Sequence, residues 1–298
     1  MQQRLALLWL ALFITSCAVR NPPMISADTG VDLPDAGWDA NLPQPRDAGP
    51  PQDAGPRLDD VLIYAHSRDT LYTFSPYTNT VSEIGVFRHA DGTPAGFMLD
   101  LAVDAAGAVF TSGDETLFAV DPLTAVVTVV GDFDLATERL FALSFLTPSE
   151  SPDGTEMLVG ATNEGVVYAV DRVTARTRRL GTYPEGWLSS GDIVSIDGLG
   201  TFATLRRSDY PGDVLARILF ARDGSSTVTV VGPVRSGAED FRQLFGLGYW
   251  GRDVFGFDNM GRLLRLDRAT GATEVVTTAT GATQFWGAGV TTQAPVLF

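Results

Sequence analysis

The chain has 298 residues, of which 45% are apolar and 19% charged, and its formal net charge at pH 7 is −15. Such an acidic chain lacks the basic stripe that neutralises phosphates, so nucleic acid is excluded as a partner. A single cysteine, Cys17, excludes an intramolecular disulfide. The only histidines, His66 and His89, are too few for zinc sites of the usual kind, and no metal or other cofactor is expected.

The N-terminal segment, residues 1–16, has one positive charge at Arg4 and then an almost wholly apolar run over 5–15. This pattern is typical of a secretory signal peptide and is too short to span a bilayer stably. Its end, Ile14-Thr15-Ser16-Cys17, resembles the lipobox of bacterial lipoproteins. The resemblance implies cleavage before Cys17 and lipid attachment at that residue. Because Ala18 follows instead of Asp, it also implies the outer membrane of a diderm bacterium, on the periplasmic or the external side. A plain secretory signal is the alternative.

Residues 17–57 have the composition of a linker. Asp-Ala-Gly recurs at 35–37, 47–49 and 53–55 among many prolines. Such a segment cannot bury enough apolar surface to offset the entropy lost on ordering. We therefore predict a disordered tether that follows the lipidated cysteine and precedes a folded domain over 58–298.

The folded domain contains five copies of one pattern, an apolar strand that runs into a polar turn. The clearest copy, residues 117–124, reads Leu-Phe-Ala-Val-Asp-Pro-Leu-Thr. An Asp or Ser that opens such a turn can hydrogen-bond the backbone two residues on. The copies recur about every 44 to 52 residues, which is the period of propeller blades. The residues that open the five turns are Ser75, Asp121, Asp171, Asp223 and Asp267.

Most periods supply four strands, because each holds four runs rich in Val, Thr, Phe and Tyr. The predicted strands of the second to fifth blades are 98–104, 108–113, 116–121 and 125–131; 140–146, 156–162, 166–171 and 175–181; 191–197, 199–206, 214–221 and 226–232; 243–249, 252–257, 261–266 and 272–277. The first period supplies only three, at 61–66, 70–75 and 79–85.

The missing strand lies at the other end of the chain. Residues 284–289, Gln-Phe-Trp-Gly-Ala-Gly, match residues 243–248, Gln-Leu-Phe-Gly-Leu-Gly, which form the innermost strand of the fifth blade. A C-terminal strand that completes the first blade would close the ring and remove its open edges. We therefore predict an all-β, five-bladed β-propeller that is closed by the C-terminal strand.

The innermost strands support this prediction, because one column of the aligned repeats is small while its flanks are large. Blades pack most closely near the axis, so bulky residues of one blade fit only against small residues of the next. Simple alternation in an ordinary sandwich is the alternative explanation. The small column consists of Ala102, Ser144, Ser195, Gly248 and Gly289.

The repeat units resemble those of a broad superfamily of bacterial propellers that includes quinoprotein-like and WD40/YVTN-like groups. The resemblance covers nearly all of residues 58–298 and implies the architecture alone, because members of that superfamily bind, scaffold or catalyse.

Carboxylates at the ends of the innermost strands are the first candidate site residues. Asp100 and Asp192 lie at one end of these strands, and Asp104 and Asp197 lie at the other. Glycoside hydrolysis needs two carboxyl groups at a defined separation, so Asp100 and Asp192 are the candidate pair for that reaction. The structural alternative, that these aspartates stabilise turns, is the interpretation we favour.

Aromatic residues and one loop complete the candidates. Trp187 and Trp250 adjoin loops, where they could stack on a ligand, whereas Trp286 is predicted to pack between blades. The loop at 206–213 breaks the repeat, and such loops often carry function. A neutral insertion on a tolerant surface is the alternative, and it is the interpretation we favour. His66, at the end of a predicted strand, is expected to be a surface or turn residue.

The predicted function is that of a non-enzymatic, lipid-anchored propeller of the cell envelope that binds a protein, peptide or glycan. Two alternatives remain, an envelope glycoside hydrolase or lyase that uses central carboxylates, and a structural component of an envelope complex. No catalytic residue and no metal ligand is assigned. The ligand-binding candidates are Asp100, Asp104, Asp192, Asp197, Trp187 and Trp250, and the lipid attachment site is Cys17.

Overall fold

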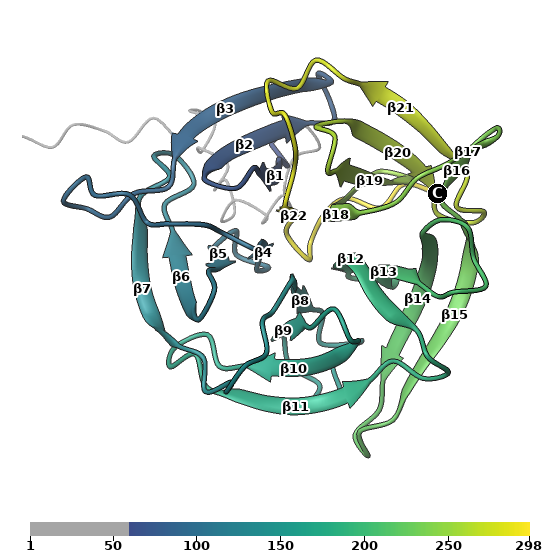
Figure 1. The fold of residues 1–298 in the computed structure, drawn as a ribbon, viewed down its shortest axis with the longest axis horizontal. Coiled ribbons are helices and arrows are strands. Elements are labelled where there is room, and N and C mark those ends of the chain that lie inside the picture. Colours follow the sequence, from purple (N-terminus) through teal and green to yellow (C-terminus); the bar gives the residue numbers. More distant parts are fainter. Residues whose placement is uncertain (1–59) are drawn as a thin grey trace, which may run out of the picture. The chain divides into compact units, whose positions relative to one another are not determined.

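The computed structural model describes residues 60–298, in which five four-stranded antiparallel sheets are arranged in a ring (Figure 1). The all-β, five-bladed propeller predicted from the repeat is confirmed. The predicted signal peptide, lipidated cysteine and linker lie outside the described residues. Within the described part of the chain, no helix is long and apolar enough to cross a membrane.

Each blade has its innermost strand at the axis and its outermost strand at the rim (Figure 1). The predicted strand positions agree with the observed bounds to within a few residues. Blade 1 consists of β22 (Gly287–Gly289), β1 (Ile63–His66), β2 (Thr70–Ser75) and β3 (Thr80–Val86). Blade 2 consists of β4 (Asp100–Val103), β5 (Val109–Ser112), β6 (Thr116–Val120) and β7 (Val127–Asp132). Blade 3 consists of β8 (Ala142–Leu146), β9 (Met157–Ala161), β10 (Val166–Val170) and β11 (Thr177–Thr182).

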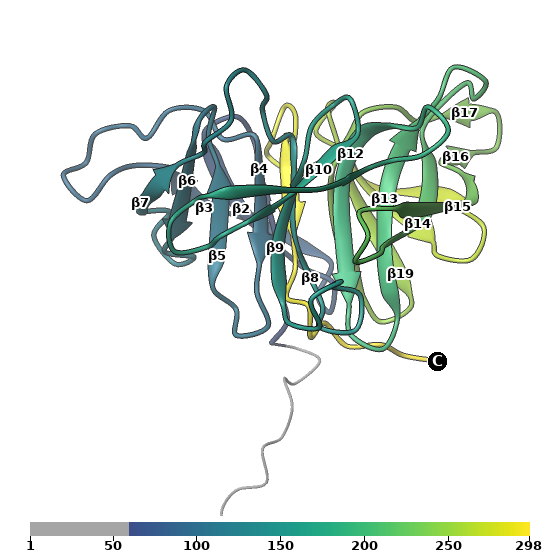
Figure 2. The ribbon, with the colours of Figure 1, turned by 90° about the horizontal axis from the view of Figure 1, so that it is seen from below.

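The last two blades are joined through a small hairpin that the repeat did not predict. Blade 4 consists of β12 (Leu188–Ile196), β13 (Gly200–Arg206), β14 (Val214–Phe220) and β15 (Ser226–Pro233). The hairpin consists of β16 (Arg235–Ser236) and β17 (Glu239–Asp240), and it lies at the upper edge of the ring in Figure 2, whereas the C-terminus lies at the lower edge. Blade 5 consists of β18 (Leu244–Trp250), β19 (Asp253–Asp258), β20 (Leu263–Asp267) and β21 (Thr273–Thr277).

The ring is closed by β22, as predicted. This strand pairs with β1 in antiparallel register, so that Ala288 lies opposite Ala65. The segment before it is tied to both neighbouring blades: the amide of Trp286 donates to the carbonyl of His66 at 2.8 Å, and that of Phe285 to the carbonyl of Asp258 at 3.0 Å. Both chain ends of the ring therefore meet in one sheet, and β22 pairs the edge of β1 that faces the axis.

The polar turns form the hydrogen bonds that their sequence predicts. In four of the five copies the opening aspartate accepts a bond at 2.9 to 3.0 Å from the amide two residues on, as Asp121 does from Leu123. In the first copy, Ser75 accepts a longer bond from Thr78, three residues on. These local contacts explain why the turn recurs although the blade surfaces differ.

The small column requires one correction. Val194 of β12 pairs with Phe202 just as Ala102 of β4 pairs with Phe110, so Val194 and not Ser195 occupies this column. The prediction was shifted by one residue because β12 carries an irregularity between Ser189 and Ile193, which residue spacing does not reveal.

The glycines of the column confirm its packing argument. A Cβ on Gly248 would lie 2.5 Å from the side chain of Ile63 in blade 1, and a Cβ on Gly289 would lie 2.9 Å from the side chain of Leu101 in blade 2. A large residue of one blade thus occupies the space that the small residue of its neighbour leaves empty.

Candidate functional site

Equivalent positions of the five innermost strands, two residues before the small column, form a layer around the axis, and two of the five are aspartates. Asp100 and Asp192 are fully buried, whereas the three other positions are small. Asp100 accepts a hydrogen bond from its own neighbour, Leu101, at 2.8 Å and a second from Leu143 of blade 3 at 2.6 Å. It therefore fastens blade 2 to blade 3. The small positions are Ala142, Gly246 and Gly287.

Asp192 repeats this arrangement two blades further on. Its carboxylate accepts a hydrogen bond from the amide of Ile193 at 2.5 Å and another from the amide of Leu247 at 2.7 Å, which fastens blade 4 to blade 5. The favoured interpretation of the sequence, that these aspartates stabilise turns, does not hold for Asp100 and Asp192: both lie within innermost strands and accept hydrogen bonds from amides of those strands.

The two carboxyl groups, here called the acidic pair, also meet each other. Burial raises the pKa of Asp100 well above its usual range, and the neighbouring charge of Asp192, with which it shares a hydrogen bond, raises that pKa further. Burial likewise raises the pKa of Asp192. Because a hydrogen bond between two carboxyl groups requires a proton on one of them, we expect the pair to share a proton.

His66 lies beside the acidic pair and is fully buried. The prediction that it is a surface or turn residue was wrong, because Gly287 of β22 pairs directly opposite it and covers it. Its Nδ1 lies 2.6 Å from the carbonyl oxygen of Ser67, whereas its Nε2 has no hydrogen-bond partner in the described part of the chain. A Cβ on Gly287 would lie 2.5 Å from this Nε2 and 2.1 Å from an oxygen of Asp100, so glycine is required there.

Burial lowers the pKa of His66 to about 4. In the unfolded chain the imidazole titrates near 6.5, so as the pH falls from 6.5 to about 4 the unfolded chain takes up a proton that the folded chain does not. The free energy of unfolding therefore falls as the pH drops from 6.5 to about 4, by on the order of 3 kcal/mol, because protonation of His66 favours the unfolded chain. We expect His66→Gln to remove this part of the pH dependence. Urea unfolding of both proteins between pH 4 and 7.5 measures it, and parallel curves for the two would contradict it.

A pocket with a volume of about 1030 Å³ opens at the end of the axis where the innermost strands begin. All five blades contribute to it, since it is lined by residues that precede or begin β22, β4, β8, β12 and β18 (Figure 1). We call it the axial pocket. It is lined by Leu99, Phe141, Asn163, residues 188–191, residues 206–208, residues 210–213, residues 242–243, Phe245 and Trp286.

The loop that breaks the repeat, residues 206–213, forms one wall of the axial pocket. The amide of Asp213 donates to the carbonyl of Phe241 at 2.9 Å, so this wall is fixed to the segment that follows the β16–β17 hairpin. The Asp213 carboxylate is 3% exposed and accepts hydrogen bonds from the hydroxyl of Ser190 and the amide of Leu244. Burial raises the pKa of Asp213.

Three arginines give the axial pocket a positive side. Arg207 is already engaged, because its guanidinium lies 4.1 Å from the ring of Trp187 and forms two hydrogen bonds to Asp209. Arg206 uses only its Nε, which donates to the carbonyl of Ser189 at 3.2 Å. Arg242 is exposed and forms no hydrogen bond or ion pair with the residues that the structure describes. Arg206 and Arg242 therefore have donors available to a ligand.

Aromatic side chains also line the axial pocket. Trp286 is half-buried there, which corrects the prediction that it packs between blades, and Phe141 is 40% exposed. Trp286 lies just outside β22 in the chain, so its position at the mouth depends on where that strand ends. Trp187 is buried and packs against the pocket-lining Tyr210, with 5.3 Å between the centres of the two rings.

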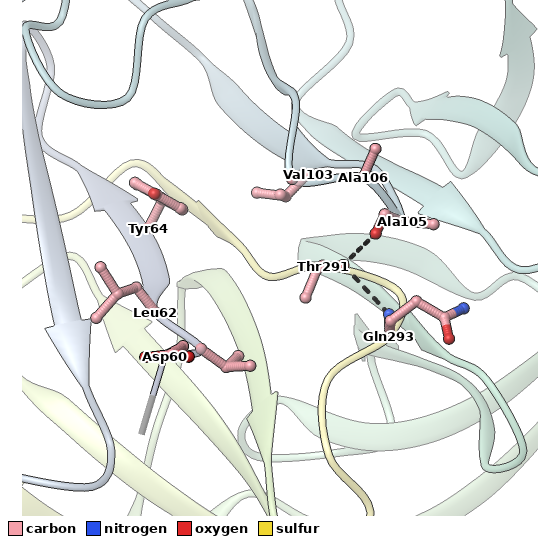
Figure 3. A pocket seen from close by; sticks show the side chains of 10 residues that line it. Asp60, Leu62, Tyr64, Val103, Ala105, Ala106, Thr291 and Gln293 are labelled. Carbon is pink, nitrogen blue, oxygen red and sulfur yellow. Dashed lines mark hydrogen bonds between the residues drawn. The ribbon is translucent and has the colours of Figure 1, made fainter. Parts of the chain in front are cut away.

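The opposite face of the ring has a second, smaller cavity of about 310 Å³ (Figure 3). It is lined by Asp60, the first described residue, and by residues at the far ends of the innermost strands. The hydroxyl of Thr291 donates to the carbonyl of Ala105 at 3.4 Å and accepts from the amide of Gln293 (Figure 3). The described chain thus begins on the face opposite the axial pocket.

The remaining candidates belong to this opposite face. Asp104 accepts from the amides of its own turn and forms an ion pair with Arg172 at 2.8 Å. Asp197 is an exposed turn residue, and Trp250 is partly buried against the core at the end of β18. Neither cavity is lined by any of the six predicted ligand-binding residues, and of these the structure brings only Asp100 and Asp192 together.

The residues that line the axial pocket were only partly accessible to sequence reasoning. The break of the repeat at 206–213 was a correct signal for one wall. Arg242 carried a weaker signal, since it directly precedes the innermost strand of blade 5. Among residues 60–298, no three His, Cys, Asp or Glu side chains are grouped so that they could hold a metal ion.

Among the comparisons with known proteins, only the search of solved structures found similar proteins. No protein-family model and no curated protein matches the chain. Among solved structures, an auxiliary nutrient binding protein from Bacteroides thetaiotaomicron VPI-5482 is 11% identical, with a TM-score of 0.43 over 72% of this chain and 53% of that one. BamB from Moraxella catarrhalis is 13% identical, with a TM-score of 0.34 over 70% of each chain. Virginiamycin B lyase from Staphylococcus aureus is 11% identical, with a TM-score of 0.38 over 76% of this chain and 70% of that one. The chain thus spans about half of the length of the nutrient-binding protein.

Proposed function

We propose that this protein is a lipid-anchored binding module of the cell envelope, which captures its ligand in the axial pocket. The observation that carries the proposal is the pocket itself. A volume of about 1030 Å³ is at the upper end of small-molecule and cofactor sites, and the lining combines arginines with aromatic side chains. A regular propeller ring does not need the 206–213 loop. Ligand binding would explain why this loop is ordered as a wall of the pocket.

The place where the N-terminal segment joins the domain is compatible with an anchored role. The described chain begins at Asp60, on the face opposite the axial pocket. A tether formed by residues 17–57 would therefore join the domain away from the mouth of the axial pocket and leave that mouth accessible. In this proposal the anchor lies in the outer membrane of a diderm bacterium.

The anchor is tested by lipid labelling in cells. We expect the wild-type chain to incorporate radiolabelled palmitate and to fractionate with membranes, and Cys17→Ala to lose both properties, because Cys17 is the only thiol available for acylation. Secretion of an unlabelled wild-type chain into the soluble fraction would contradict the anchor and would support a plain secretory signal.

The pocket is tested by screening the full chain on glycan and peptide arrays, followed by titration of each ligand found. Phe141→Ala removes an aromatic face of the pocket, and Phe97→Ala is its matched control, because Phe97 is 54% exposed but lines neither cavity. We expect Phe141→Ala to weaken binding at least tenfold, by about 1.4 kcal/mol, and the control to change nothing. Arrays without any ligand, or equal binding by both variants, would overturn the proposal.

The structure argues against Asp100 and Asp192 as the catalytic pair of the hydrolase alternative. Asp100 and Asp192 are inaccessible and hydrogen-bonded to each other, whereas paired-acid hydrolysis needs carboxyl groups about 5 to 9.5 Å apart on either side of a bound sugar. The structural alternative predicts a different experimental result: membrane extracts would return a partner in fixed stoichiometry, and its binding would survive Phe141→Ala.

A further inference from the structure

We infer that the ligand of the axial pocket is an acidic glycan, an oligosaccharide that carries carboxylates on its sugar rings. The inference rests on the proposed function and specifies the ligand class. It follows from three features of the pocket lining: arginines with free hydrogen-bond donors, exposed aromatic surface, and polar side chains that carry hydroxyl and amide groups.

The charge of the axial pocket is opposite to that of the protein. The chain has a net charge of −15, yet Arg206 and Arg242 bring guanidinium groups to the pocket, of which Arg206 uses only its Nε in a hydrogen bond and Arg242 has no hydrogen-bond partner among the described residues. The one carboxylate of the lining, Asp213, is 3% exposed and is satisfied by Ser190 and Leu244. Guanidinium groups bind carboxylates through paired, charge-assisted hydrogen bonds, so an anionic ligand fits this side.

The backbone next to Arg242 is held at Gln243. Gln243 has a φ of 59°, in the left-handed region that residues other than glycine rarely adopt. Its backbone carbonyl accepts from the amide of Asn259 at 3.2 Å, and its side chain accepts from the amide group of Asn259. Strained backbone of this kind persists where surrounding contacts impose it, and it is frequent at binding sites.

The rest of the lining suits a sugar. Trp286 and Phe141 present aromatic surface, on which the apolar face of a sugar ring can stack. Asn163 and Ser208 are exposed and line the same pocket with groups that both donate and accept hydrogen bonds, as sugar hydroxyls require. An acidic peptide would satisfy the arginines but would leave this combination unused, so we favour the glycan.

The inference is tested by isothermal titration calorimetry on the full chain. The probes are trisaccharides of galacturonate, mannuronate and guluronate, each beside its neutral carboxyl-reduced counterpart, with triglutamate as a peptide probe. We expect at least one uronate trisaccharide to bind at least tenfold more tightly than its neutral counterpart, and added salt to weaken this binding.

Two variants link the binding to the pocket. Arg242→Gln is expected to weaken uronate binding on the order of 10- to 100-fold, since it removes a charge-assisted contact. Arg176→Gln is the matched control, because Arg176 is exposed, pairs with Asp134 and does not line the pocket. Wild-type affinity in Arg176→Gln and a loss in Arg242→Gln would support the inference.

Each other outcome would overturn it. Equal binding of neutral and acidic trisaccharides, or an Arg242→Gln variant with wild-type affinity, would overturn the acidic class and leave the proposed binding function in place if Phe141→Ala still loses its ligand. Binding of triglutamate alone would assign the pocket to an acidic peptide. Failure of every uronate would refute the glycan, and the array screen would then decide the proposed function separately.

Discussion

Deletion of residues 284–298 is expected to abolish cooperative thermal unfolding of the protein. The deletion removes the innermost strand of blade 1 and with it Phe285 and Ala288, both fully buried in the largest core cluster. Loss of a buried phenylalanine alone costs about 3 to 5 kcal/mol, and domains of this kind have about 5 to 15 kcal/mol in total. The edge of β1 and the buried His66 would also become accessible to water. Differential scanning calorimetry of the truncated chain measures the result.

Two controls separate ring closure from a general effect of shortening. Removal of Phe298 alone should leave the melting temperature unchanged, because this residue is 87% exposed. A synthetic peptide of residues 284–296 added to the truncated chain should restore a cooperative transition, because the peptide can occupy the place of β22 beside β1. A truncated chain that melts within a few degrees of the full chain would refute the closing role of the strand.

Substitution of one member of the acidic pair is expected to have the second largest effect. Asp192→Ala leaves the amides of Ile193 and Leu247 without their acceptor in a fully buried site. At about 1 to 3 kcal/mol for each unsatisfied donor, the free energy of unfolding should fall by about 2 to 6 kcal/mol at pH 7. Asp192→Asn retains one acceptor oxygen and can donate to Asp100, so it should lose less than half as much. Urea denaturation of the three proteins measures the difference.

The pH dependence of the asparagine variant provides an independent check. Since burial raises the pKa values of the acidic pair, its contribution to stability is full below the ordinary carboxyl pKa of 3.8 and is lost as the pH rises through the raised values. Asparagine does not ionise, so we expect the stability of Asp192→Asn relative to wild type to improve from pH 4 to pH 8. His66 is common to both proteins and largely cancels in this difference. A difference that does not vary with pH would show that the pair does not share a proton.

The interior of the axis shows how far residue patterns reach. The repeat places Asp100 and Asp192 at equivalent positions of two blades, and this much follows from alignment of the strands. That their carboxyl groups meet follows from the closed ring, which brings the innermost strands of blades 2 and 4 together at the axis, and no spacing along the chain encodes this. Trp286 and His66 were misplaced for a related reason: the position of each depends on β22, a three-residue strand whose limits are set by its pairing with β1.

The sequence by itself determined the all-β architecture, the number of blades, the polar turns and the closing strand. These features depend on local hydrogen bonds and on hydrophobic patterns that repeat along the chain, so each copy reinforces the others. Only the tertiary structure decided which side chains share a cavity. Arg206 and Arg242 belong to different blades and reach one pocket because the ring brings the starts of its innermost strands together at the axis, and that convergence is a property of the closed ring as a whole.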